Sequence, residues 1–388
     1  MKIIMVHIGA LSKYPPVLSA LETLSNLGED IVFCGTDIDT ITEKYCNDRN
    51  IATISIRANY EKAINPVMKL PRLLHIRHRI WEAIDSIYGA NTVLWVFSDL
   101  ALKHLGGKLL RYKFVLHMFE LAQSTLFYRK FPLFRMNTAT YAKRAVGVVQ
   151  AEYNRAQISK AWWNLDKLPY VIPNKPSYGL SVEKSAAICD EEAKRVISSF
   201  GQRKIILYQG LVTQERPLKP FVDAVNKLGD EYVLVIMSGS AAANQYRECT
   251  RTFVIPFIAP PLHLQVTSHA HIGILSYVPT KNEYSVLNSI YCAPNKIYEY
   301  SRFGIPMIGN EIPGLRYTLV TERMGICVGD FTVGSITEAV RQIELEYSDY
   351  SANAKKFYDK QDLGSLYADI LGDLRVQLTH EGLEREKR

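Results

Sequence analysis

Near the middle of the sequence stands the segment Leu168-Pro169-Tyr170-Val171-Ile172-Pro173-Asn174-Lys175-Pro176. Closely spaced prolines stiffen the chain and interrupt regular structure, which is typical of a boundary between domains. The chain has 388 residues, more than one hydrophobic core usually serves. We therefore predict two domains that meet at this segment, residues 1–173 and residues 174–351. A C-terminal helix at residues 352–380 is predicted to return to the first domain.

On both sides of this segment, short apolar runs alternate with helical patterns. Before it, apolar runs predict strands at Lys2–Val6, Asp30–Cys34, Ile51–Ile56, Thr92–Phe97, Lys113–Leu116 and Ala145–Val149. After it, they predict strands at Lys204–Tyr208, Tyr232–Met237, Phe253–Pro256, Ile272–Leu275 and Pro306–Ile308. Strands that alternate with helices form parallel sheets covered by helices on both faces. The predicted fold class is therefore α/β, with two Rossmann-like domains.

Composition excludes several classes of protein. Hydrophobic residues make up 47% of the chain and charged residues 22%, which is typical of a folded protein and excludes a disordered one. The six cysteines form no Cys-x-x-Cys pair and no metal-ligand spacing with histidine, so we predict free thiols and no metal site. The N-terminal apolar run ends at His7, too early for a signal peptide, and no later run is long enough to span a membrane. These features predict a cytoplasmic protein, with the inner face of the cell membrane as a further option.

The net charge of +7 favours anionic partners. Two stretches, Lys69–Trp81 and Phe127–Arg135, interleave cations with large apolar side chains. This pattern is typical of peripheral contact with an anionic membrane. A helix with a solvated basic face and a buried apolar face explains the same pattern. Nucleic-acid binding is not expected, because no nucleic-acid module accompanies the charge.

In parallel α/β sheets, ligands bind beyond the carboxyl ends of the strands. The first predicted strand leads into a loop that contains Gly9 and then starts a helix. This loop is not a G-x-G-x-x-G fingerprint, and the sequence has no P-loop. A nicotinamide-dependent dehydrogenase and a nucleoside triphosphatase are therefore not expected.

A stronger signal lies in the segment Pro294-Asn295-Lys296-Ile297-Tyr298-Glu299-Tyr300, which runs on to Gly304-Ile305-Pro306. Pro294 or Asn295 is suited to open a helix and Gly304 to end it. Lys296 and Glu299 are then on one face, where the lysine suits a phosphate and the carboxylate suits ribose hydroxyls. The spacing alone also fits an ordinary surface Lys–Glu pair.

The same segment, extended back to Asn288, resembles the donor-binding motif of bacterial GT-B glycosyltransferases of family 4. The likeness extends to the opening strand and its glycine loop, to Val171–Asn174, and to Leu207–Gly210. It implies two Rossmann-like domains that face a cleft, with the acceptor on the first and the nucleotide sugar on the second. The implied enzyme is a retaining hexosyltransferase that requires no metal or other cofactor.

The resemblance implies that a UDP- or GDP-sugar is the co-substrate. The acceptor is then a hydroxyl of a glycan or of a polyprenyl-diphosphate-linked glycan, in the synthesis of a surface polysaccharide such as a capsule or O-antigen.

For the donor site, the resemblance is carried over residue by residue. Glu299 matches the second glutamate of the family's E-x7-E motif, which implies ribose binding, whereas Tyr291 stands where the first glutamate is usual. Leu211 replaces a usual arginine, and Arg216 matches the second of the family's two phosphate-binding cations. Arg216 and Lys296 are therefore the predicted phosphate-binding pair. The predicted donor-site residues are Gly9, Gly210, Arg216, Tyr291, Asn295, Lys296 and Glu299.

For catalysis we predict His117, Glu120 and Glu299. Phe114–Glu120 resembles the family's strand that ends in a histidine near the acceptor and the transferred sugar, although a histidine satisfied at a strand end fits equally well. Glu120 fits catalytic support or a helix cap. Weaker candidates near other strand ends are Asp99, Gln150, Glu152 and Asn154.

Two other functions stay open at this point. One is a nucleotide-sugar 2-epimerase of the same fold, which needs acid and base groups around the sugar that the sequence does not place. The other is a non-catalytic partner subunit, which Leu211 and Tyr291 suggest because they replace charged residues of the family.

Overall fold

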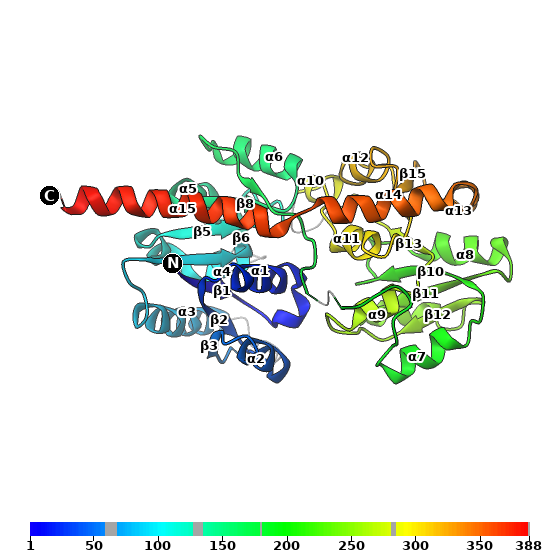
Figure 1. Cartoon of the computed structure of the whole chain (residues 1–388), viewed down its shortest axis with the longest axis horizontal. Coiled ribbons are helices and arrows are strands. Elements are labelled where there is room, and N and C mark those ends of the chain that lie inside the picture. The colour runs from blue at the N-terminus through cyan, green and yellow to red at the C-terminus, as the bar shows by residue number, and fades with distance from the viewer. Residues whose placement is uncertain (59–67, 127–134, 179–180, 281–284, 387–388) are drawn as a thin grey trace. The chain divides into compact units, whose positions relative to one another are not determined.

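A computed structural model describes residues 1–58, 68–126, 135–178, 181–280 and 285–386. The chain forms two compact units (Figure 1): unit 1 comprises Met1–Pro173 together with Asp362–Arg388, and unit 2 comprises Asn174–Gln361. Each unit is a parallel sheet with helices packed against it, so the predicted α/β class with two Rossmann-like domains is confirmed.

Unit 1 is built on a seven-stranded parallel sheet with the order β3-β2-β1-β4-β5-β8-β9. Its strands are β1 (Lys2–His7), β2 (Asp30–Thr36), β3 (Ala52–Ile56), β4 (Thr92–Phe97), β5 (Phe114–His117), β8 (Gly147–Gln150) and β9 (Tyr170–Val171). The central strands are apolar along almost their whole length and are buried, as a parallel sheet covered on both faces requires. A short antiparallel pair, β6 (Thr125–Leu126) and β7 (Arg135–Met136), lies outside this sheet.

The helices of unit 1 connect these strands. They are η1 (Leu11–Lys13), α1 (Pro15–Asn26), α2 (Thr40–Asn47), α3 (Lys69–Asp85), α4 (Ser98–Leu105), η3 (Gly106–Arg111), α5 (Thr138–Arg144), α6 (Tyr153–Trp163) and α15 (Leu363–Glu386). Helix α1 begins at a proline and is followed by Gly28 at φ +78°, the left-handed conformation that ends many helices. Helix α1 packs against α15, and α3 packs against α4.

Unit 2 is built on a six-stranded parallel sheet with the order β12-β11-β10-β13-β14-β15. Its strands are β10 (Lys204–Gln209), β11 (Tyr232–Met237), β12 (Thr252–Ile255), β13 (Ile272–Leu275), β14 (Met307–Asn310) and β15 (Gly325–Val328). Its helices are α7 (Glu191–Ser198), α8 (Lys219–Leu228), η4 (Ala241–Tyr246), α9 (His263–Thr267), α10 (Leu287–Ile290), α11 (Asn295–Ser301), α12 (Pro313–Leu319), α13 (Val333–Leu345) and α14 (Tyr347–Lys360). Apolar side chains of β10, β11, α8 and α13 form a continuous buried core.

The C-terminal segment differs from the single helix predicted at residues 352–380. Helix α14 belongs to unit 2 and α15 to unit 1, so unit 2 extends to Gln361 rather than to residue 351. The backbone of Gln361 is extended, and the Asp362 side chain accepts a hydrogen bond from the Ser365 amide at 3.1 Å. This contact caps the start of a new helix, because it satisfies the Ser365 amide, one of the first-turn amides that have no partner within the helix.

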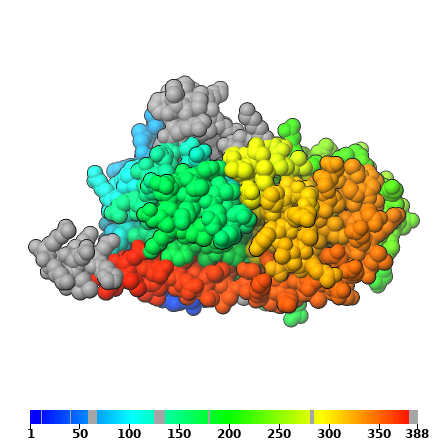
Figure 2. Space-filling model, turned by 90° about the horizontal axis from the view of Figure 1, so that it is seen from above, coloured from blue at the N-terminus to red at the C-terminus, as the bar shows by residue number. Residues whose placement is uncertain are grey.

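Helix α15, red in Figures 1 and 2, lies along unit 1 and completes it. The Tyr367 ring lies 5.6 Å from the Trp95 ring, and the Tyr170 hydroxyl donates to Asp373 at 2.6 Å. Arg375 pairs with Glu29, which also binds the N-terminal ammonium group at 3.2 Å. The last helix is therefore an integral part of the first unit.

Two strands of the two parallel sheets were not predicted from the sequence. β9 lies inside the proline-rich segment and pairs with β8 at the sheet edge, where flanking prolines are tolerated because a short edge strand needs few amide donors. β15 covers only four residues that begin with a glycine, so its apolar pattern is too short to stand out.

Each sheet has a point at which the strand order reverses. In unit 1 the chain runs outward from β1 to one side and from β4 to the other, and in unit 2 it runs outward from β10 and from β13. Loops diverge at such points and leave room for a ligand at the carboxyl ends of the strands. In each unit, we therefore expect a ligand-binding site at this reversal point.

Candidate functional site

In unit 2, Gly210 and Lys296 meet at the reversal point. Gly210 directly follows β10 with φ +121°, a conformation that favours glycine. A Cβ atom at this position would lie 3.3 Å from Cε and 3.4 Å from Nζ of Lys296, which comes from α11. The absence of a side chain at Gly210 therefore makes room for the lysine.

Lys296 and Arg216 share a neighbour, Tyr277, which follows β13. The Lys296 ammonium group donates to the Tyr277 hydroxyl at 2.8 Å. The Arg216 guanidinium carbon lies 5.2 Å from the centre of the Tyr277 ring, and Lys296 Nζ lies 5.1 Å from the same centre. The structure thus brings together the two residues predicted to bind phosphate, from segments eighty positions apart in the sequence.

Burial, and after it the positive charge of Arg216, lower the pKa of Lys296 to about 7 against the opposing effect of Glu299. The Lys296 residue is only 8% exposed. Two cations held within electrostatic reach of each other destabilise one another, and an anion bound between them relieves this repulsion. The arrangement therefore favours a phosphate group.

Glu299 belongs to a buried hydrogen-bonded network. Its carboxylate binds Nε2 of His263 at 3.1 Å and the Gln209 side-chain amide, and the residue is 4% exposed. The Thr267 hydroxyl donates to the carbonyl oxygen of the Gln209 side chain at 2.8 Å. Burial raises the pKa of Glu299, but attraction to His263 and hydrogen bonds from His263 and Gln209 outweigh it, so the net pKa is lowered. The carboxylate is thus held in its ionised form.

This network limits the hydrogen bonds that Glu299 can make to a ribose. Both carboxylate oxygens already accept a hydrogen bond from the protein, although each has a second lone pair for a ribose hydroxyl. The sequence analysis missed His263, Gln209, Thr267 and Tyr277. Gln209 ends a strand and carried a usable signal, whereas His263 lies in a loop-to-helix region that no pattern marked.

The remaining predicted donor residues flank α11. Asn295 is its first residue, but the helix is only seven residues long and no side chain caps it, so side chains rather than the helix dipole must supply most of the positive charge. Tyr291 ends the short helix α10 and is half-buried. The Asn174 side chain donates to the Ala293 carbonyl at 2.7 Å and ties the proline-rich segment to the loop before α11.

In unit 1, His117 ends β5 and is 1% exposed. The Trp95 indole donates to its Nδ1 at 3.3 Å. Burial lowers the pKa of His117 to about 3, so the ring is neutral at physiological pH and cannot act there as a charged acid. Its Nε2 atom is buried and has no hydrogen-bond partner among the described residues.

Glu120 lies close enough to Asp99 to influence the pKa of the Asp99 carboxyl group. Burial raises the pKa of Asp99 and the negative charge of Glu120 raises it further. The Glu120 side chain is 41% exposed, with an oxygen 4.0 Å from Nη1 of the buried Arg155. Burial raises the pKa of Tyr14, and the negative charges of Asp99 and Glu120 raise it further. A Cβ atom at Gly9 would lie 3.1 Å from the Tyr14 ring. The loops after β1, β4 and β5 thus place Gly9, Asp99 and Glu120 at one edge of the sheet.

The weaker candidates after β8 have structural partners. The Gln150 side chain is fully buried and donates to the Ser159 hydroxyl at 2.7 Å. Glu152 is the N-cap of α6 and accepts a hydrogen bond from the Arg155 amide at 3.0 Å and one from the Asn154 side chain at 2.8 Å. Glu152 and Asn154 therefore fix the start of α6.

The first basic stretch lies on α3, and most of the second, Phe127–Arg135, lies outside the described residues. Helix α3 buries Leu73, Ile76, Ile80, Trp81 and Ile84. Around its first turns, however, Met68, Leu70 and Leu74 are 51%, 46% and 48% exposed. A helix with a solvated basic face and a buried apolar face was the alternative to membrane contact. It describes most of α3 but not the exposed apolar side chains of its first turns.

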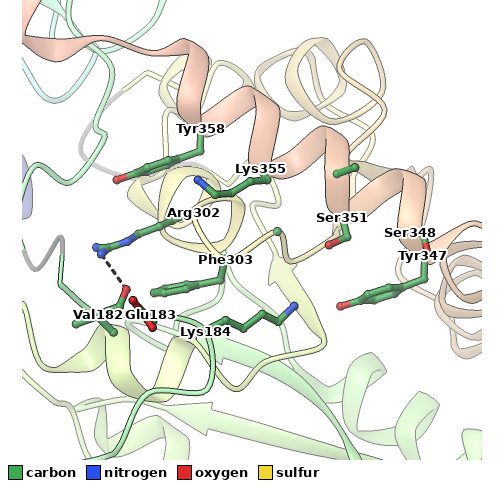
Figure 3. A pocket seen from close by; sticks show the side chains of 12 residues that line it. Val182, Glu183, Lys184, Arg302, Phe303, Tyr347, Ser348, Ser351, Lys355 and Tyr358 are labelled. Carbon is green, nitrogen blue, oxygen red and sulfur yellow. Dashed lines mark hydrogen bonds between the residues drawn. The ribbon is translucent and has the colours of Figure 1, made fainter.

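A surface pocket of about 720 Å³ lies elsewhere in unit 2. Figure 3 shows Tyr347 of α14 pointing toward Lys184 and Lys355 of the same helix lying beside Tyr358. Arg302 donates to the Val182 carbonyl at 3.0 Å. None of the predicted site residues lines this pocket, which adjoins the end of α11 opposite Lys296. We do not assign the donor site to it.

Within the described residues there is no cluster of His, Cys, Asp and Glu arranged to hold a metal ion. No helix in that part of the chain is both long and apolar enough to cross a membrane.

Several solved structures resemble the chain over nearly its whole length. HepE from Anabaena in complex with UDP-glucose is 12% identical with a TM-score of 0.67, over 97% of this chain and 100% of that one. Sucrose-phosphate synthase from Thermosynechococcus elongatus is 16% identical with a TM-score of 0.62, over 100% of both chains. A structure from Listeria monocytogenes named as a UDP-N-acetylglucosamine 2-epimerase is 10% identical with a TM-score of 0.60, over 92% of this chain and 90% of that one.

No protein-family model matches the sequence, and no curated protein matches it either. At identities this low, the structural likeness shows a common fold and not a common activity. The chain therefore has the two-domain Rossmann-like fold of these nucleotide-sugar enzymes.

Proposed function

We propose that the chain is a glycosyltransferase that moves a hexose from a UDP- or GDP-sugar to a hydroxyl of a glycan or of a polyprenyl-diphosphate-linked glycan. Unit 2 binds the donor and unit 1 binds the acceptor. The reaction retains the anomeric configuration and requires no metal, as the resemblance to family 4 implies.

The observation that carries this proposal is the pairing of Lys296 with Arg216 around Tyr277 at the reversal point of unit 2. A single surface Lys–Glu pair would leave its lysine in water, whereas Lys296 is buried beside a second cation. Such a site favours an anion with more than one negative charge, such as a diphosphate. The structural relatives bound to UDP-glucose support the same class of ligand.

In the proposed reaction, the oxygen of the acceptor hydroxyl bonds to the anomeric carbon as the bond from that carbon to the diphosphate breaks. Negative charge develops on the leaving phosphate, which takes up the proton of the hydroxyl. Arg216 and Lys296 stabilise that charge, which lowers the barrier because the charge is greater in the transition state than in the substrate. Glu299, fixed by His263 and Gln209, accepts hydrogen bonds from the ribose hydroxyls. The neutral His117 and the carboxylate of Glu120 orient the transferred sugar and the acceptor.

The proposal extends to location and pathway. The exposed apolar side chains beside the cations of α3 support peripheral contact of unit 1 with an anionic membrane, where a lipid-linked acceptor resides. A role in the synthesis of a capsule or O-antigen follows from that acceptor. We place the protein in the cytoplasm and at the inner face of the membrane.

The test is nucleotide release and sugar transfer by the purified protein with a panel of UDP- and GDP-sugars. We expect release of one nucleotide with one sugar, and a loss of at least about 100-fold in turnover for Arg216→Ala, because a charged contact to the leaving group is removed. Glu299→Ala is expected to weaken nucleotide binding. Unchanged binding and turnover in both variants, with unchanged circular dichroism, would contradict the site.

The same assay separates the alternatives. A 2-epimerase would convert the nucleotide sugar into its C2 epimer without an acceptor, and the epimerase relative gives this outcome a structural basis. A non-catalytic subunit would neither transfer nor hydrolyse any donor.

A further inference from the structure

The surface pocket of unit 2 is not used by the proposed function. Its volume of about 720 Å³ is in the range of pockets that hold small molecules. Figure 3 shows side chains of α14 on one side of the pocket and those of residues 182–184 on the other, with Arg302 and Phe303 between them. All of these residues belong to unit 2, so the pocket is complete within one unit.

One face of helix α14 forms a wall of the pocket. The helical repeat places five lining side chains on the same side of the helix, over about 16 Å of its length. An occupant can therefore contact this wall at several points. The five side chains are those of Tyr347, Ser348, Ser351, Lys355 and Tyr358.

The aromatic residues at the two ends of this wall are fixed by contacts outside the pocket. The Tyr347 ring stacks on the His271 ring with 4.1 Å between their centres, and its hydroxyl donates to the His271 carbonyl at 3.1 Å. The Tyr358 hydroxyl donates to the Pro176 carbonyl at 3.2 Å. Because both rings are already held in place, a ligand that contacts them loses little affinity to side-chain ordering.

The end of α11 and the residues after it form the floor. A Cβ atom at Gly304 would lie 2.8 Å from Oγ of Ser351, so the glycine allows α14 to approach closely. Arg302 is 7% exposed and donates to the carbonyls of Tyr178 and Val182 at 3.4 Å and 3.0 Å. The guanidinium group thus fixes the segment opposite α14 and adds a positive charge beneath the pocket.

The charges of the lining favour an anion. Three cations stand against one carboxylate, that of Glu183. Lys355 pairs with Asp359, one turn further along α14, at 2.5 Å. Lys184, by contrast, makes no hydrogen bond or ion pair with any residue that the structure describes, and desolvation lowers the pKa of its ammonium group. A bound anion would supply the partner that this group lacks.

Two hydroxyl groups on the facing wall add hydrogen-bonding capacity. The side chains of Ser348 and Ser351 line the pocket and make no hydrogen bond within the described part of the chain. Each hydroxyl can both donate and accept a hydrogen bond, as the hydroxyls of a sugar also can. The pocket thus combines a cation without a partner, free hydroxyls and fixed aromatic rings.

We propose that this pocket binds a sugar phosphate, with its phosphate beside Lys184 and its hydroxyl groups toward Ser348 and Ser351. The ammonium group selects the phosphate, and the serines and the Tyr347 ring select a polyhydroxylated body. The site shares no residue with the donor site around Lys296 and Arg216. The inference therefore does not depend on the proposed function.

The experiment is calorimetric titration of the full-length protein with ribose 5-phosphate and mannose 6-phosphate. Ribose, mannose and inorganic phosphate serve as comparisons. We expect one of the sugar phosphates or both to bind at least about tenfold more tightly than the parent sugar and inorganic phosphate, because only the sugar phosphate uses both kinds of contact.

Four variants locate the binding. Lys184→Met should weaken it by about tenfold or more, and Lys184→Arg should keep it, because the arginine retains the charge. Lys356→Met is the matched control, since Lys356 is an exposed lysine of α14 that does not line the pocket. Arg216→Ala tests binding in the donor site instead. Both of these variants should match the wild type.

The outcomes separate the two sites. Binding that Lys184→Met leaves unchanged overturns the inference, and if Arg216→Ala abolishes that binding, the sugar phosphate occupies the donor site. Failure of both sugar phosphates to bind, or binding no tighter than that of inorganic phosphate, overturns it as well. Sugar transfer plays no part in this titration, so a failure of the proposed function leaves the result intact.

Discussion

At the scale of single residues, the main feature is the burial of Lys296 beside Arg216. Burial holds the pKa of the Lys296 ammonium at about 7, far below its ordinary value. A group whose charged form is disfavoured in the folded state reduces the stability of that state wherever the unfolded chain would be charged. Lys296 therefore reduces stability in exchange for binding an anion.

We predict that Lys296→Met raises the thermal stability of the protein and weakens nucleotide binding. The methionine keeps the length of the side chain and removes the buried charge. At neutral pH the melting temperature should rise by about 3 °C or more, while affinity for the nucleotide falls more than about tenfold. Differential scanning calorimetry and titration calorimetry measure the two effects, with the exposed Lys227→Met of α8 as a control that changes neither.

The pH dependence has a definite sign. Between pH 7 and about 10 the unfolded chain keeps the Lys296 proton that the folded chain has lost, so the unfolded state binds more protons. The contribution of Lys296 to the free energy of unfolding therefore rises with pH in this window. The difference in stability between Lys296→Met and the wild type should shrink from pH 7 to pH 9, and a constant difference would contradict the assigned pKa.

The sequence predicted Lys296 from its place at the start of a helix, and it predicted Gly210 and Arg216 from the resemblance to the family's donor-binding motif. It missed Tyr277 and His263 because neither stands at a patterned position. Tyr277 reaches the site only when β13 is placed next to β10, and His263 only when α9 packs against α11. Such neighbours follow from strand order, which local patterns do not contain.

At the scale of elements, α3 combines a buried apolar face with exposed apolar residues in its first turns. Met68, Leu70 and Leu74 stand beside Lys69 in a part of the helix that has no acidic residue before Glu82. An anionic bilayer would attract the lysine and bury the apolar side chains, so both kinds of residue would act together.

We predict that the double variant Leu70→Glu, Leu74→Glu lowers the binding of the protein to anionic vesicles by about fivefold or more. Each change removes apolar burial and adds repulsion from the lipid head groups. Vesicle co-sedimentation with and without phosphatidylglycerol measures the effect, and Leu345→Glu at an 84% exposed position in unit 2 is the control. Equal binding of both variants would exclude α3 as the contact surface.

Element boundaries show where local patterns fail. The strands β1, β4, β10 and β11 were predicted because their apolar runs are long, and their bounds agree to within one residue. The helix predicted at 352–380 is divided between α14 and α15, because helical periodicity continues from one into the other and hides the break at Gln361. Only packing of the two helices into different units makes that break necessary.

At the scale of the whole molecule, the chain builds unit 1 from two separated segments. Tyr367, Ile370, Leu371 and Leu374 of α15 are each at most 2% exposed, so the last helix supplies part of the core of the first unit. Unit 2, by contrast, consists of one continuous segment, Asn174–Gln361.

We predict that Tyr367→Ala lowers the free energy of unfolding of unit 1 by about 3–5 kcal/mol, since it leaves a cavity beside Trp95. All four tryptophans lie in unit 1, so the urea transition followed by tryptophan fluorescence reports on that unit. Val376→Ala, at a 57% exposed position of α15, is the control and should leave the transition in place. Equal midpoints for the two variants would show that α15 adds little to the core.

The division of unit 1 reverses the usual relation between synthesis and folding. Domains commonly fold in the order in which the ribosome makes them. Here the second unit is complete once Gln361 has been synthesised, while the first still lacks helix α15, which is synthesised later. Chaperones would therefore meet an unfinished first unit until α15 has been made, and a stop codon placed before α15 would damage the unit whose synthesis began first.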